Sequence, residues 1–114
     1  MKKLQVLTVG VKATEIQGIQ STLDILGCNY VCLNNANAAL DNMIEHEPDL
    51  IVVDFEKIPM FFFDYIKVEG YRGQIVCIAS SLESSTMAQL QAKNIHIVDK
   101  PFDLFYTIGH ILKS

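Results

Sequence analysis

Cysteine is scarce in this sequence, and the arrangement of the few cysteines excludes two kinds of cross-link. The chain of 114 residues has three, Cys28, Cys32 and Cys77, and no two of them have a metal-ligand spacing such as C-x-x-C. An odd number without that spacing indicates neither a disulfide framework nor a structural zinc site. We interpret all three as reduced thiols of a cytoplasmic protein, which serve as small apolar side chains.

Long apolar runs and an excess of positive charge are also absent. No stretch approaches the ~20 apolar residues of a membrane-spanning helix. The start, Met1-Lys2-Lys3, leads into an apolar run that is too short for a signal peptide. The formal net charge of −4 gives no general attraction for nucleic acid or for an anionic membrane. We therefore expect a cytoplasmic domain with no membrane and no nucleic-acid partner.

Apolar residues make up half of the sequence, which is enough for a single buried core in a chain of this length. No linker, low-complexity segment or internal repeat interrupts it. Residues 1–114 are therefore predicted to form one domain.

Five short apolar runs predict strands, and the segments that follow them predict helices. The runs are rich in β-branched residues and cover residues 4–9, 28–33, 49–54, 74–79 and 95–98. Apolar residues at helical spacing predict helices at residues 14–27, at about 35–47, and at 62–69, 86–94 and 102–112. One of Asn34, Asn35 or Asn37 is expected to cap the second helix, and Asn94 to end the fourth. This alternation predicts a parallel sheet with helices on both faces.

Charged and polar residues stand where several of these strands end. Asp54 closes the third run, Ala79 and Ser80 end the fourth, and Lys100 follows the fifth. In a doubly wound α/β sheet of order 2-1-3-4-5, the carboxyl ends of the strands share one edge, where ligands gather. We expect these residues to converge there, with the loop after the first strand facing them.

Three segments together resemble the receiver domain of two-component response regulators. They are Leu50-Ile51-Val52-Val53-Asp54, Ile75-Val76-Cys77-Ile78-Ala79-Ser80 and Asp99-Lys100-Pro101-Phe102-Asp103. The resemblance covers the whole chain and implies the flavodoxin-like, CheY-like (βα)5 three-layer sandwich. It also implies signal transduction in a phosphorelay, without enzymatic activity beyond self-phosphorylation and self-dephosphorylation.

The resemblance assigns roles to individual residues. Asp54 would accept a phosphoryl group from a histidine kinase, and Lys100 and a hydroxyl at the end of the fourth strand, Ser80, would contact its oxygens. Pro101 would follow a cis peptide bond. Acidic residues after the first strand would hold Mg²⁺ together with Asp54, because the metal neutralises charge during phosphoryl transfer.

The sequence departs from the family's pattern at several of these positions. Val11 and Lys12 stand where the two metal-binding acids belong, which leaves Asp54 as the one acid of the metal site. Ala79 stands at the hydroxyl position, with Ser80 one residue later, and Ile97 replaces the usual aromatic switch residue. Glu15 and Glu56 are the nearest substitutes for the acids, and no metal or other cofactor is expected.

These departures favour a pseudo-receiver, which acts through contacts with a histidine kinase or a downstream signalling protein. The alternative is a working phosphoacceptor, in which Asp54 is phosphorylated and Mg²⁺ is required. A flavodoxin-like cofactor binder is a weaker third hypothesis, carried by Thr8, Gly10 and Thr14 around the first loop.

Two surfaces are candidates for such contacts. The fourth helix, fifth strand and last helix form the face through which receiver domains pair, and that face would include Phe105 and Tyr106. In the run Phe61-Phe62-Phe63, one or two rings are expected to be exposed, because successive helical residues point about 100° apart.

Overall fold

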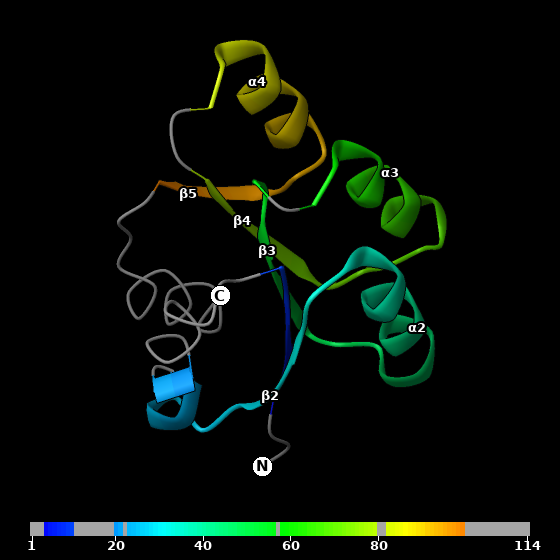
Figure 1. The fold of residues 1–114 in the computed structure, drawn as a ribbon, viewed down its shortest axis with the longest axis vertical. Helices are drawn as coiled ribbons and strands as arrows, with labels where there is room; N and C mark the ends of the chain where they lie inside the picture. The colour runs from blue at the N-terminus through cyan, green and yellow to red at the C-terminus, as the bar shows by residue number, and fades with distance from the viewer. Residues whose placement is uncertain (1–3, 11–19, 22, 57, 80–81, 100–114) are drawn as a thin grey trace.

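A central parallel sheet organises the part of the chain that the structure describes. The computed structural model describes residues 4–10, 20, 21, 23–56, 58–79 and 82–99 (Figure 1). Its strands are β1 (Gln5–Val9), β2 (Asn29–Leu33), β3 (Leu50–Asp54), β4 (Gln74–Ala79) and β5 (His96–Asp99). They lie in the order β2-β1-β3-β4-β5, and all four pairings are parallel. The predicted strand order is confirmed.

Helices cover the sheet in layers. The three helices with defined bounds are α2 (Ala36–His46), α3 (Met60–Val68) and α4 (Ser84–Ala92). In Figure 1, α2 and α3 lie on one side of the sheet, and a short helical segment within residues 20–25 lies on the other. No helix within the described ranges is long and apolar enough to cross a membrane.

The strand β3 is buried on both faces and lies at the centre of the core. Ile51 and Val53 belong to a cluster that includes Phe62 and Phe63 of α3. Leu50 and Val52 belong to a second cluster on the opposite face, with Leu23. The continuous apolar sequence of this strand follows from its position, because a central parallel strand meets helices on both sides.

Local signals explain the ends of α2. Among the three candidate asparagines, Asn35 is the cap, and its Oδ1 accepts a hydrogen bond from the Ala38 backbone N at 2.9 Å. The helix ends at Glu47, whose N–H donates to the Met43 carbonyl at 3.1 Å, and Pro48 follows. Glu47 has φ +40°, a left-handed conformation that costs energy for a residue with a Cβ.

The ends of the other elements differ from the prediction by one or two residues. The strands β1, β2, β3 and β5 each begin one residue later than predicted, and β5 also ends one residue later. The helix α3 begins at Met60 and α4 at Ser84, two residues earlier than predicted in each case. Pro59 explains the first helix start, because its φ of −73° suits the residue that precedes a helix. Asn94 ends the α4 segment as predicted, with φ +61°.

The three consecutive phenylalanines divide between the core and the surface. Phe62 and Phe63 are fully buried, whereas Phe61 is 63% exposed. The Phe62 and Phe63 rings meet edge to face with centroids 5.9 Å apart, and Phe63 also stacks on Phe55. The prediction that one or two rings are exposed is confirmed, with one exposed ring.

Candidate functional site

Asp54 lies at the carboxyl end of β3 and is fully buried. Its Oδ1 accepts a hydrogen bond from the Glu56 backbone N at 2.9 Å, within a turn that the Ile58 N–H closes on the Asp54 carbonyl at 3.2 Å. The turn is tied to the next strand by the Phe55 N–H, which donates to the Ile78 carbonyl at 3.0 Å. Backbone groups therefore hold this carboxylate at the carboxyl edge of the sheet, which is where open α/β folds bind their ligands.

The two predicted switch positions lie beside this edge. Ala79 is fully buried at the end of β4 and is paired with Asp99 of β5. Ile97 is half-buried and packs against the core cluster under α3, whereas His96, one residue earlier, is exposed. The alternation of side chains along the strand accounts for this difference. At both positions the side chain is aliphatic, so neither can donate a hydrogen bond to a phosphoryl group.

Several predicted site residues lie outside the described residues, and their roles stay predictions. These are Val11, Lys12, Ser80, Lys100 and Pro101. The same holds for Thr14, Glu15, Phe105 and Tyr106, which were named for a phosphate cradle, a substitute metal ligand and the pairing face. The structure does place the last residue of β5, Asp99, level with Ala79 at the carboxyl edge.

A magnesium site does not fit the residues present. In the described ranges, no three His, Cys, Asp or Glu side chains lie close enough to hold a metal ion. Glu56 is exposed and contacts Asp54 through its backbone N, and the loop that begins at Gly10 has no Asp or Glu before Glu15. Mg²⁺ in proteins is commonly held by one or two carboxylates and bound substrate phosphates, and among the described residues Asp54 is not part of any group of three such ligands.

Thr8 does not support a cofactor cradle in the first loop. Its side chain is buried within β1, and its hydroxyl has no hydrogen-bond partner in the described part of the chain. A hydroxyl enclosed in the sheet is not available to a phosphate at the surface. Of the three residues named for this hypothesis, Gly10 is also buried.

Cys77 is paired with Val53 in the sheet, and its thiol interacts electrostatically with Asp54. Burial raises the pKa of the Cys77 thiol to about 12, and the negative charge of Asp54 contributes to the same shift. Burial and the charge of Asp49 also raise the pKa of Cys28. All three cysteines are free thiols, and Cys32 is the least buried of them.

These thiols should differ in reactivity and in their effect on stability. At neutral pH, a disulfide reagent should label native Cys32 first, because Cys28 and Cys77 are buried and protonated. Labelling of native Cys32→Ser as fast as the wild type would contradict this prediction.

The buried Cys77 thiol should also make stability depend on pH. Above pH 9, the Cys77 thiol ionises in the unfolded chain, whereas in the folded protein it stays protonated up to about pH 12. Unfolding in urea should therefore show on the order of 1 kcal/mol of lost stability by pH 10, relative to Cys77→Ala.

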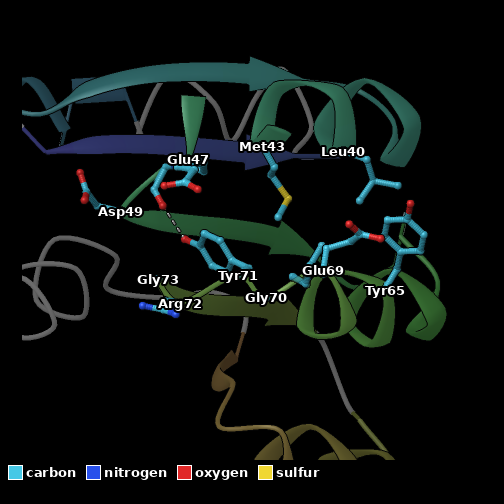
Figure 2. A pocket seen from close by; sticks show the side chains of 12 residues that line it. Leu40, Met43, Glu47, Asp49, Tyr65, Glu69, Gly70, Tyr71, Arg72 and Gly73 are labelled. Carbon is cyan, nitrogen blue, oxygen red and sulfur yellow. Dashed lines mark hydrogen bonds between the residues drawn. The ribbon is translucent and has the colours of Figure 1, made fainter. Parts of the chain in front are cut away.

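A pocket that the sequence did not predict lies at the opposite edge of the sheet, between the ends of α2 and α3. It has a volume of about 680 Å³ (Figure 2). Its lining comprises Leu40, Met43, Glu47, Pro48, Asp49, Tyr65, Ile66, Glu69, Gly70, Tyr71, Arg72 and Gly73. The pocket is formed by the turns that lead into β3 and β4, and its volume is in the range of small-ligand and side-chain binding sites.

Tyr71 lines this pocket and connects two of the segments that form it. Its hydroxyl donates a hydrogen bond to the Pro48 carbonyl at 2.8 Å, which joins the turn before β4 to the end of α2 (Figure 2). Burial, with a contribution from the charge of Asp49, raises the pKa of Tyr71 far above its usual range. The hydroxyl therefore stays protonated, and able to donate, well above neutral pH.

The fold is that of CheY-like receiver domains. A signal receiver domain from Vibrio parahaemolyticus matches with a TM-score of 0.87 and 16% identity, over 98% of this chain and 92% of that one. The chemotaxis response regulator CheY4 of Vibrio cholerae matches at 0.83 and 18%, over 96% and 99%. A CheY-like response regulator receiver domain protein from Methanospirillum hungatei JF-1 matches at 0.84 and 11%, over 98% and 93%. No family model matches the sequence, and no curated protein matches it significantly.

Proposed function

We propose that the chain is an atypical receiver-type signalling module that acts through protein contacts and is phosphorylated weakly or not at all. The observation that carries this proposal is the setting of Asp54, a fully buried carboxylate in a structure whose described residues contain no group of three or more His, Cys, Asp or Glu side chains that could hold a metal ion. The fold supports the receiver-type role, because solved receiver domains match nearly the full chain.

The chemistry of phosphoryl transfer explains why this arrangement disfavours phosphorylation. The reaction needs positive charge to neutralise the phosphoryl oxygens, and a bound metal ion usually supplies it. Here Lys12 stands in place of an acid, and in this proposal Lys12 and Lys100 balance the charge of Asp54 without a metal. The aliphatic Ala79 and Ile97 would then transmit little change even if a phosphoryl group arrived.

Protein partners follow from this function. The expected partner is a histidine kinase or a downstream signalling protein of the cytoplasm, and the domain itself would not bind nucleic acid.

The face of α4 and β5 could also form a homodimer. However, the exposed residues of α4 are small or polar, comprising Ser84, Ser85, Ala88, Gln89, Gln91 and Ala92. The described part of this face therefore offers little apolar area to a stable dimer.

A working phosphoacceptor is the alternative, and the position of Asp54 favours it. Asp54 closes a central strand at the carboxyl edge of the sheet, where open α/β folds place their chemistry. Even then, the activity would be limited to taking up and releasing the domain's own phosphoryl group.

Beryllofluoride, a stable mimic of the acyl phosphate, separates the two functions. We expect the amide NMR spectrum to be unchanged by millimolar Mg²⁺ and beryllofluoride, because the described residues contain no group of ligands that would hold a metal ion beside Asp54. Changes in amide chemical shift at the ends of β3, β4 and β5 that disappear in Asp54→Asn would refute the proposal that the receiver is atypical. Asp41→Asn is the matched control, since Asp41 is an exposed acid of α2 and undergoes the same chemical change.

A further inference from the structure

An exposed apolar stripe runs along α3 beside the pocket. Phe61, Tyr65 and Val68 are 63%, 45% and 83% exposed, and their i, i+4, i+7 spacing puts them on one face of the helix. Tyr65 also lines the pocket, so the stripe and the pocket share a border. We call this joint surface, the pocket together with Phe61 and Val68, the α2–α3 groove. Clustered large apolar side chains in contact with water are typical of an interaction surface.

The rim of the α2–α3 groove is acidic. Glu47 ends α2, Glu69 ends α3, and both line the pocket together with Asp49 (Figure 2). The carboxyl end of a helix already carries partial negative charge, so an acid there is unfavourable and a cation is favourable. Among the described residues, Arg72 is the one basic residue of the pocket lining, and Lys67 lies in the last turn of α3. Three acids and two helix ends against these two basic residues leave this surface with a net negative charge.

We propose that the α2–α3 groove binds a basic amphipathic helix of a partner protein. The apolar side of such a helix would cover Phe61, Tyr65 and Val68. Its Lys or Arg side chains would lie along the groove on their alkyl stems and place their charges at the Glu47 and Glu69 carboxylates. This inference rests on the proposed function, protein contact, and names the surface and the chemistry of the partner.

Charge also argues against a second copy of this chain as the occupant. In a two-fold contact, the same patch of both molecules meets, so the acidic rim would face itself. The chain as a whole has a net charge of −4, which adds to the repulsion. A partner with complementary positive charge meets neither obstacle.

The α2–α3 groove is separate from Asp54. Asp49 lies directly before β3, and Asp54 closes that strand after five residues, so the two sites lie roughly 16 Å apart along it. Phe61 lies in the first turn of α3, toward the Asp54 end of the sheet, but Asp54 is fully buried, so a partner over Phe61 would not contact its carboxylate. Binding at the groove is therefore expected to be independent of the state of Asp54.

A synthetic helix tests the proposal directly. The probe is a labelled peptide of about four turns, roughly 14 residues, with leucines along one face and lysines beside them. One control peptide has glutamates in place of the lysines, and another has serines in place of the leucines. Because the chain contains no tryptophan, a tryptophan in the peptide reports binding by its fluorescence without interference. The lysine peptide should bind at least about tenfold more tightly than either control.

Variants of the chain show where the peptide binds. Phe61→Ser with Val68→Ser should weaken binding about tenfold, whereas Ile25→Ser, an equally exposed residue away from the groove, should not. Glu69→Lys should weaken the lysine peptide and strengthen the glutamate peptide. Glu83→Lys, an exposed acid outside the pocket lining, should change neither.

Equal affinity for the lysine and glutamate peptides would overturn the proposal, and so would unchanged affinity in the Phe61 and Val68 variant. Binding that is unaffected by Asp54→Asn is expected. A response to beryllofluoride would count against the proposal of an atypical receiver and would leave the groove proposal unaffected. If no peptide binds, the proposal of a binding groove is wrong. The proposed receiver-type function would then still be tested by the beryllofluoride experiment at Asp54.

Discussion

Phe62→Ala should lower the free energy of unfolding by about 3–5 kcal/mol, whereas Phe61→Ala should change it by less than about 0.5 kcal/mol. The two residues are adjacent and of the same type, but Phe62 is fully buried and Phe61 is 63% exposed. Truncation at Phe62 removes a ring from the core cluster beneath α3 and leaves a cavity. Truncation at Phe61 removes a ring that is already in contact with water.

Urea unfolding followed by far-ultraviolet circular dichroism measures both changes. The pair controls for helix propensity, because each substitution introduces the same alanine into the first turn of α3. Similar losses for Phe61→Ala and Phe62→Ala would mean that Phe61 also packs in the core, which would remove it from the α2–α3 groove. A small effect at Phe61 together with loss of peptide binding would show that this ring serves recognition.

Gly73→Ala should cost about 1–3 kcal/mol, because there is no room for a Cβ at this position. An added Cβ would overlap the Tyr71 ring and hydroxyl and would lie 2.8 Å from the Asp49 carbonyl oxygen. Neither neighbour can easily move. Tyr71 is bonded to the Pro48 carbonyl at 2.8 Å, and the Asp49 carbonyl accepts from the Gln74 N–H at 3.1 Å.

A double-mutant cycle identifies the cause of this loss. Tyr71→Ala removes one of the two obstacles, so Gly73→Ala should cost less in that background than in the wild type. Arg72→Ala is the control, since Arg72 is exposed and lies in the same turn. An equal cost of Gly73→Ala in both backgrounds would assign the whole effect to the Asp49 carbonyl and would contradict the overlap with Tyr71.

The sequence was sufficient for the fold because the fold depends on repeated local patterns. The run from Leu50 to Asp54 is apolar on both faces, and it occupies the centre of the sheet. Alternation of strands and helices then leaves few possible topologies. The helix starts were less accurate, because Pro59 sets the start of α3 through backbone geometry that hydrophobic spacing does not report.

The candidate sites were only partly predictable, for two physical reasons. Asp54 could be placed because it closes a strand, but its burial and its bond to the Glu56 backbone N depend on a turn with no sequence signature. The pocket arises where the ends of two helices and two turns come together. Periodicity describes one face of one helix, so it could not show that Glu47 and Glu69 border a common space.

The hydrogen bonds between Gln5 and Asp49 have a consequence for the rate of folding. The Gln5 N–H donates to the Asp49 carboxylate, and the Asp49 N–H donates to the Gln5 carbonyl, both at 2.8 Å across 44 residues of sequence. These bonds form only after the chain has closed a long loop, which carries an entropic cost before any contact offsets it. The central pair of strands is therefore expected to form in the transition state for folding, and to limit its speed.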